Sequence, residues 1–217
     1  MNLAPFIDHT NLSPTATSKD IDQLCKEALE YNFASVCVHS VWAQHIIAQL
    51  KGSVASCVVV DFPFGAAPTS HRTKVAADLS ESGVQELDIV VPLGLVLSGN
   101  WLEVERDLKE IRENTLQSCL KLILETCYLS DDDKRFLAKM ASGMGYDFVK
   151  TSTGFGPSGA TEADVTILKN SVYPWTEVKA SGGIKSTWKA HCMIKAGASR
   201  IGTSRGIDLI MDEGTHA

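Results

Sequence analysis

The chain has 217 residues, of which 44% are hydrophobic and 21% charged, with a formal net charge of −6 and a pI near 5.5. This composition is typical of a folded globular protein, and the acidic balance argues against nucleic-acid binding, which needs a basic face. No run of about 18 apolar residues predicts a membrane span, and the first residues do not resemble a signal peptide.

Six cysteines, at positions 25, 37, 57, 119, 127 and 192, occur without a CxxC pair. Several of them lie inside apolar runs, which is typical of buried, reduced thiols. Disulfides are rare in reducing compartments. We therefore expect free thiols and a cytoplasmic location.

Short β-branched runs alternate with helix-like stretches along the chain, beginning after a short N-terminal lead-in. The predicted strands are Phe6–Thr10, Ser35–His39, Val54–Phe62, Glu86–Pro92, Cys119–Thr126, Asp147–Thr153, Glu177–Ser181 and Arg200–Thr203. The predicted helices between them cover 18–31, 40–50, 70–82, 101–115, 131–143, 161–170 and 186–196. No linker or low-complexity segment interrupts this order, so we expect one domain, 1–217.

Helix-end signals support these boundaries. Residues suited to cap a helix start, each followed by acidic residues, are Ser18, Ser130 and Thr161. Glycines suited to close a helix just before the next strand are Gly83, Gly145 and Gly197.

Eight strands alternating with helices indicate an α/β fold with a parallel sheet, either open or closed. Strands of an open parallel sheet are apolar on both faces. Here one face is apolar and the other polar: Leu87 and Ile89 alternate with Glu86 and Asp88. Only the interior of a barrel gathers polar groups around one site. The sequence therefore predicts a single (β/α)8 TIM barrel.

Two neighbouring strands each carry a lysine on the interior side, Lys150 and Lys179. Consecutive strands lie side by side in a barrel, so the two ammonium groups should approach each other. A buried lysine beside another cation gives up its proton more readily, and a neutral amine can attack a carbonyl. An ion-pair role is the alternative for either lysine alone.

Carboxylates and a thiol also fall on the interior side. Asp88 is expected to move protons near the lysine pair, although an ion pair with Lys179 or Lys121 fits the same position. For Asp8, structural and catalytic roles fit equally well. Cys37 and Lys121 are expected to line the pocket.

Glycine-rich loops follow the last three predicted strands, at 152–156, 181–184 and 201–206. In this fold, the loops after strands seven and eight commonly bind phosphate through backbone N–H groups. Arg205 could add a bidentate contact. The histidines show no metal-ligand spacing, and no nucleotide-binding fingerprint occurs. We therefore expect neither metal nor cofactor.

Several motifs resemble the deoxyribose-phosphate aldolase family. The segment Phe148–Phe155 (FVKTSTGF) resembles its Schiff-base motif, and Val178–Ile184 (VKASGGI) resembles the motif of its second lysine. Further similar blocks, in family order, are Asp8–Leu12, Ser35–Val38, Phe62–Gly65, Glu86–Val90 and Leu124–Thr126. The resemblance covers about residues 6 to 207.

The resemblance implies reversible, metal-independent cleavage of 2-deoxy-D-ribose 5-phosphate to D-glyceraldehyde 3-phosphate and acetaldehyde, in deoxyribonucleotide and carbohydrate catabolism. It implies that Lys150 forms the imine, that Lys179 promotes loss of its proton, and that Asp88 relays protons with an ordered water. It also implies a homodimer or higher oligomer. The residues that it assigns to the phosphate are Gly154, Gly182, Gly183, Gly202 and Ser204.

The chain departs from the family pattern at Arg72, Val75 and Pro92, where many members have Lys, Glu and Asn. It also ends at Ala217 without the tyrosine of some relatives. These departures leave substrate preference and proton transfer open. Two alternatives follow: a lysine aldolase for another phosphorylated sugar, or a barrel that binds a sugar phosphate without catalysis.

Overall fold

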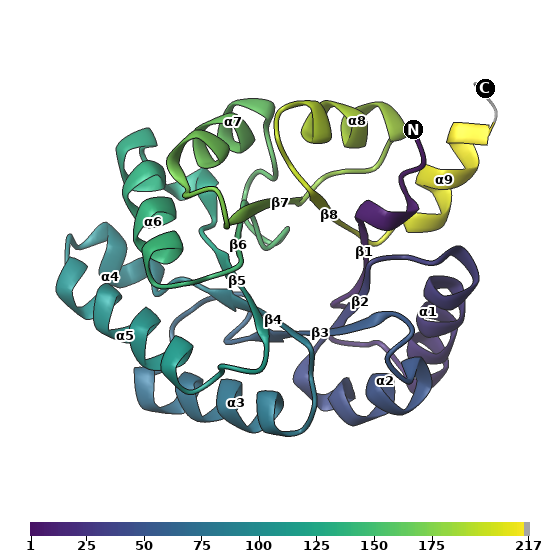
Figure 1. Cartoon of the computed structure of the whole chain (residues 1–217), viewed down its shortest axis with the longest axis horizontal. Helices are drawn as coiled ribbons and strands as arrows, with labels where there is room; N and C mark the ends of the chain where they lie inside the picture. Colours follow the sequence, from purple (N-terminus) through teal and green to yellow (C-terminus); the bar gives the residue numbers. More distant parts are fainter. Residues whose placement is uncertain (215–217) are drawn as a thin grey trace.

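A computed structural model describes residues 1–214 of the chain. Eight parallel strands form a closed barrel in the order β1 to β8, with β8 paired to β1. Figure 1 shows the strands as an inner ring and the helices as an outer ring. The prediction of a (β/α)8 barrel is confirmed. Ala217, the end of the predicted domain, lies outside the described residues.

All eight predicted strands are present, and most are shorter than predicted. Their bounds are β1 Ile7–Asn11, β2 Ser35–Val38, β3 Ala55–Val60, β4 Glu86–Val90, β5 Cys119–Ile123, β6 Phe148–Lys150, β7 Glu177–Ser181 and β8 Arg200–Thr203. The residues that follow four of these strands belong to the loops at the mouth of the barrel. These strands end at Val60, Val90, Ile123 and Lys150.

The helices cover the outside of the barrel. Their bounds are α1 Ser18–Tyr31, α2 Ala43–Leu50, α3 Thr69–Glu81, α4 Leu93–Leu97, α5 Trp101–Glu113, α6 Asp131–Gly143, α7 Glu162–Ser171, α8 Thr187–Lys195 and α9 Gly206–Gly214. The sequence did not predict α4 or α9, and 40–42 is a 3-10 turn before α2. No helix in the described part is long and apolar enough to cross a membrane.

Helix ends follow the expected chemistry with one correction. The Ser130 and Thr161 side chains accept the N–H groups of Asp133 and Asp164, as caps do. Ser18 is not a cap, because it is already the first residue of α1 and Thr17 takes the cap position. The glycines at 83, 145 and 197 have the left-handed φ expected after a helix.

The strands separate an apolar outer layer from a polar interior. Leu87, Leu120 and Val149 are fully buried in the core between strands and helices, and each such side chain stabilises the fold by about 1.5–3 kcal/mol. On the interior side, Lys150 pairs in register with Lys179 of β7. This alternation is the one that the sequence predicted, and it places the charged residues inside the barrel.

Candidate active site

The interior of the barrel holds a cluster of charged groups centred on Asp88. The Nζ atoms of Lys150 and Lys179 both lie 2.7 Å from Asp88 Oδ2, so they lie within twice that distance of each other. The other oxygen, Oδ1, accepts from Lys121 Nζ at 3.1 Å and from the Cys57 thiol at 3.2 Å. Asp88 therefore holds the two lysines together, as strand parity predicted.

A second group of ion pairs lies around Asp8. Its Oδ2 lies 2.5 Å from Lys179 Nζ and 3.7 Å from Lys121 Nζ, and its Oδ1 pairs with Arg200. Arg200 also reaches Glu86, at 2.7 Å between Nη2 and Oε1. Lys179 thus has two carboxylate partners.

These neighbours fix the charges of the buried groups. Burial alone would raise the pKa of Asp88, but Lys121, Lys150 and Lys179 together outweigh it and lower that pKa well below its usual range. Burial would likewise lower the pKa of Lys179, but Asp8 and Asp88 outweigh it and raise the pKa. Asp88 is therefore an anion and Lys179 a cation at neutral pH.

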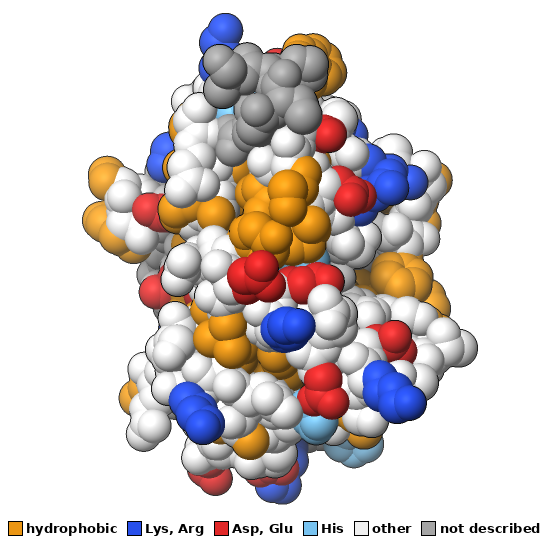
Figure 2. All heavy atoms as spheres, turned by 90° about the vertical axis from the view of Figure 1, so that its right-hand side faces the viewer, with side chains coloured by type: hydrophobic (Ala, Val, Ile, Leu, Met, Phe, Trp, Pro, Cys, Tyr) orange, Lys and Arg blue, Asp and Glu red, His pale blue; other side chains and the backbone are white. Residues whose placement is uncertain are grey.

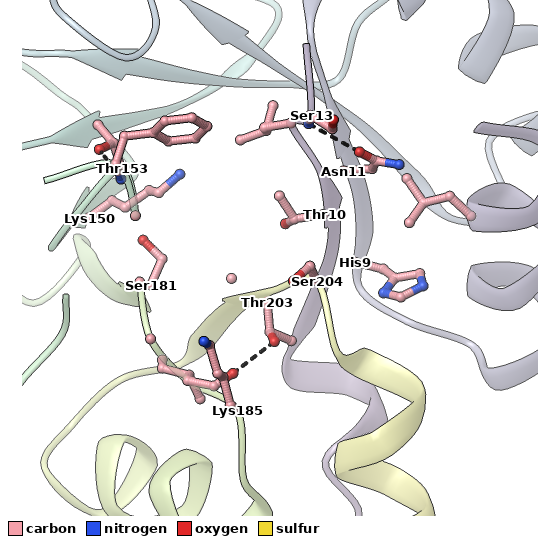
Figure 3. A pocket seen from close by; sticks show the side chains of 18 of the residues that line it. His9, Thr10, Asn11, Ser13, Lys150, Thr153, Ser181, Lys185, Thr203 and Ser204 are labelled. Atoms are coloured by element: carbon pink, nitrogen blue, oxygen red, sulfur yellow. Dashed lines mark hydrogen bonds between the residues drawn. The ribbon is translucent and has the colours of Figure 1, made fainter. Parts of the chain in front are cut away.

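A cavity of about 620 Å³ opens at the carboxyl ends of the strands, and Lys150 lines it. Figure 3 shows Lys150 and Ser181 on neighbouring strands, with Thr10 of β1 across the cavity from them. Lys150 is 3% exposed, whereas Asp88 and Lys179 are fully buried beneath it. Lys150 is therefore the amine of this cluster that a substrate in the cavity can reach.

The glycines predicted for the phosphate all line this cavity, together with Ser204. Gly182 and Gly183 have φ of +88° and +69°, a left-handed backbone that favours glycine. Gly202 is needed for close approach, because a Cβ there would lie 2.9 Å from Ser181 Cβ and 3.2 Å from Lys179 Cε. These residues surround the part of the cavity formed by the loops after β6, β7 and β8.

The structure places other predicted residues differently. Asp8, Cys37 and Lys121 were predicted to line the pocket, but they are fully buried and absent from its lining. Arg205 does not line it either. Its Nε lies 2.7 Å from Asp208 Oδ2, because the unpredicted helix α9 supplies a partner one turn along.

Lys185 and Thr203 also line the cavity. Sequence reasoning missed Lys185, and it included Thr203 only as part of the loop 201–206. Figure 3 shows Lys185 beside Thr203, in the loop that follows β7. Lys185 is the first basic residue after the Gly-Gly pair. This position, next to a loop expected to bind phosphate, could have identified it from the sequence. A lysine here adds positive charge where the glycine loops meet.

The three departures from the family pattern lie away from the cavity. Arg72 is a buried residue of α3, and its side chain donates to the Val90 carbonyl and lies near Asp61 and Asp107. Val75 is 41% exposed on α3, and Pro92 precedes α4. None of the three lines the pocket, so their effect on a bound substrate is indirect.

Among the described residues, one group has side-chain ligand atoms that are spaced closely enough to bind a metal ion. Ligand atoms of Cys37, Cys57 and Asp88 lie within 4.8 Å of one another and are buried. Both oxygens of Asp88 already accept hydrogen bonds from lysines. Lys121 and Lys179, two buried cations beside Asp88, oppose a further cation at this place.

Comparison with known proteins gives consistent results over nearly the whole chain. The family model described as DeoC/LacD family aldolase matches residues 3–210. The chain is 43% identical to the deoxyribose-phosphate aldolase of Deinococcus radiodurans, covering 97% of this chain and 96% of the relative. It is 46% identical to that of Clostridium kluyveri, covering 96% of each.

A solved structure described as a tetrameric deoxyribose phosphate aldolase from Aeropyrum pernix matches with a TM-score of 0.91. It is 33% identical, and the match covers 99% of this chain and 92% of that one. The likeness therefore extends over the barrel as a whole.

Proposed function

The chain belongs to the DeoC/LacD aldolase family, and from that premise we propose that Lys150 is the residue through which it acts as a deoxyribose-phosphate aldolase. The observation that supports this most directly is that Lys150 alone of the three clustered lysines lines the cavity. Lys150 also lies against Asp88, at 2.7 Å.

The reaction is the reversible retro-aldol cleavage of 2-deoxy-D-ribose 5-phosphate. The neutral amine of Lys150 attacks C1 of the open-chain sugar, and loss of water gives the iminium. The bond between C2 and C3 then breaks as the C3 hydroxyl loses its proton, and D-glyceraldehyde 3-phosphate leaves. Protonation of the remaining enamine at C2 and hydrolysis of the imine release acetaldehyde and restore Lys150.

In this proposal Asp88 moves the protons. Its Oδ2 is within hydrogen-bond distance of Lys150 Nζ, which is the geometric requirement for a general base or acid. When the C2–C3 bond breaks, the iminium becomes a neutral enamine, and Asp88 loses the positive charge on the Lys150 nitrogen that stabilised it. Its affinity for a proton then increases at the step that releases one.

Lys179 is assigned the role of a permanent neighbouring cation. Its charge is held by Asp8 and Asp88, and a like charge this close disfavours a second positive charge on Lys150.

The glycine loops and Ser204 are assigned to the 5-phosphate. Support comes from their place in the cavity beside Lys150 and from the use of these loops for phosphate in barrels of this kind. Lys185 adds a charge that an anion would meet. We assign Arg205 no phosphate contact, because it pairs with Asp208.

The test of this function is a retro-aldol assay with 2-deoxyribose 5-phosphate beside common ketose phosphates. We expect acetaldehyde release from the deoxy sugar and at least about a hundredfold lower kcat/KM with the others. Preference for a ketose phosphate would favour the alternative of a lysine aldolase with another substrate. Phosphate binding without turnover would favour a non-catalytic barrel.

The proposal extends to the state of the protein in the cell. We propose one catalytic domain that assembles as a homodimer in the cytoplasm, a location that six free thiols support. Exposed apolar side chains on α1 and α9, Leu29 and Met211, support self-association. Figure 2, which faces these helices, shows apolar side chains gathered in the middle of this side.

A further inference from the structure

Glu125 lies two residues beyond the end of β5, beside the strand that carries Lys150. Its carboxylate side chain is buried at 4% exposure, and its backbone is left-handed with a φ of +56°. That conformation is uncommon for a residue with a side chain, and it concentrates at functional sites. The Thr126 N–H donates to the Thr151 carbonyl at 3.0 Å, which keeps this turn against β6.

The carboxylate of Glu125 accepts from the loop after β6. The Thr153 N–H lies 3.2 and 3.3 Å from its two oxygens, and the Thr153 hydroxyl donates to Oε2. The Thr153 hydroxyl in turn accepts the Phe155 N–H at 3.0 Å. A Cβ at Gly156 would lie 3.0 Å from Cys127 Sγ and 3.3 Å from the Glu125 carboxylate, so the loop packs closely against both side chains.

The charge of Glu125 has no basic partner in the described part of the chain, where its polar partners are Thr153 and, at 3.9 Å, the Cys127 thiol. Burying a carboxylate without a counter-ion costs free energy. The cost is greater here, because Gly154, which belongs to the proposed anion site, follows Thr153 directly. The negative charge of Glu125 repels the substrate's phosphate. Glu125 therefore favours phosphate binding only if its hydrogen bonds to Thr153 contribute more to that binding than the repulsion costs.

We propose that Glu125 is a positioning residue that sets the shape of loop 153–156 for the substrate's phosphate. The inference rests on the proposed function, because it assigns the anion at this loop to the 5-phosphate. Lys150 is held differently, by strand pairing with Ile123 on one side and Lys179 on the other. Loss of Glu125 therefore disturbs phosphate binding while the nucleophile stays in place.

Glu125→Ala and Glu125→Gln, assayed with phosphorylated and unphosphorylated 2-deoxyribose, test this proposal. In the alanine variant the KM for the phosphorylated sugar should rise about tenfold, the effect of one buried hydrogen bond to a charged group. The kcat/KM for unphosphorylated 2-deoxyribose should change less than about twofold. The glutamine variant keeps the side-chain length and one acceptor, so its KM for the phosphorylated sugar should lie between those of the wild-type protein and the alanine variant.

Calorimetric binding of inorganic phosphate gives a readout independent of turnover, and its Kd should rise by the same factor as the KM. Gly156→Ala, which places a methyl group against the Cys127 sulfur and the Glu125 carboxylate, should also weaken phosphate binding. Glu105→Gln, at an exposed position on α5, is the matched control and should change neither quantity.

Equal losses with both sugars would overturn the proposal, because Glu125 would then act on Lys150 or on the fold. Unchanged phosphate binding in folded Glu125→Gln and Gly156→Ala would overturn it too, as would a wild-type protein that does not bind phosphate. A wild-type protein that binds phosphate but does not cleave the deoxy sugar would instead contradict the proposed function alone. In that case the phosphate Kd of the variants still decides the role of Glu125.

Discussion

At the scale of single residues, one carboxylate oxygen serves two ammonium groups. Asp88 Oδ2 accepts from both Lys150 and Lys179 at 2.7 Å, while Oδ1 accepts from Lys121. Removing one member of such a buried cluster leaves the others uncompensated. The lysines and Asp88 should therefore be coupled both in stability and in the pH dependence of the reaction.

Lys179→Met removes the permanent cation beside Lys150 and leaves the charges of Asp8 and Asp88 in excess. Lys150 should then hold its proton more strongly, so the pH–rate profile should move to higher pH. At pH 7 the rate should fall at least about a hundredfold. The measurement is kcat/KM for 2-deoxyribose 5-phosphate between pH 5 and 10.

This variant should also unfold more easily, by about 3–5 kcal/mol, because two carboxylates lose a buried partner. Lys179→Arg, which keeps the charge, is the second variant if Lys179→Met does not fold. Lys139→Met, at an exposed position on α6, is the control for loss of a lysine. A folded Lys179→Met protein with an unshifted pH profile would show that the two ammonium groups are not coupled.

Sequence reasoning located the two neighbouring lysines and Asp88 but not the residues around them. Lys150, Lys179 and Asp88 could be placed together because alternation along a strand fixes which side chains point inward. Arg200 and Glu125 could not, since Arg200 begins β8 and Glu125 lies beyond the end of β5, where alternation along the strand no longer fixes the direction of a side chain. Whether an inward-pointing side chain lines the cavity also depends on how deep it lies in the barrel. The sequence does not give this depth, which explains why Asp8, Cys37 and Lys121 were wrongly predicted to line the pocket.

At the scale of elements, periodicity identified all eight strands and most helices. The errors lie at element ends and in short or terminal helices. Beyond β3 and β5 the chain still has strand-like residues but takes a left-handed backbone at Asp61 and Glu125, which ends the ladder. Such turns depend on contacts made after folding, and α4, Leu93–Leu97, is too short for a periodic pattern.

The corrected cap of α1 gives a prediction at this scale. Thr17 and Asp20 hydrogen-bond at the start of the helix, with the Thr17 N–H donating to Asp20 Oδ2 at 2.7 Å. Thr17→Ala should lower the free energy of unfolding by about 1 kcal/mol. Ser18→Ala, one residue along, should change it by less than about 0.5 kcal/mol.

Chemical denaturation of the two variants measures both values on the same helix. A larger loss for Ser18→Ala than for Thr17→Ala would place the cap at Ser18, as the sequence alone suggested. A loss below about 0.5 kcal/mol in both variants would show that neither hydroxyl caps the helix.

At the scale of the whole molecule, the barrel interior links folding to pH. Burial would raise the pKa of Asp8, but Lys179, Lys121 and Arg200 together lower it below its usual range, and the pKa of Asp88 is lowered as well. A carboxyl whose pKa is lower in the folded state stabilises the fold above its unfolded pKa. That stability is lost as the pH falls below about 4.

We therefore expect the free energy of unfolding to fall below pH 4 by up to about 2.7 kcal/mol per pH unit, which corresponds to two protons. The pKa of Lys179 is raised, so its contribution is complete below its unfolded pKa and is lost only at strongly alkaline pH. Denaturation curves followed by circular dichroism between pH 7 and 2 measure the slope.

Asp8→Asn removes one of the two carboxylates and is the matched variant for this slope. It should be less stable at pH 7 and should lose stability about half as steeply in acid. A slope equal to that of the wild-type protein would show that Asp8 does not titrate with unfolding.

The most direct test of the proposed chemistry is borohydride reduction of the protein with acetaldehyde, followed by intact mass and peptide mapping. Reduction of the imine should add one ethyl group per chain, on Lys150. The folded Lys150→Arg variant, which cannot form an imine at this position, should remain unlabelled. An unmodified wild-type protein, or a label on Lys179 in place of Lys150, would contradict the assignment of Lys150 as the Schiff-base lysine.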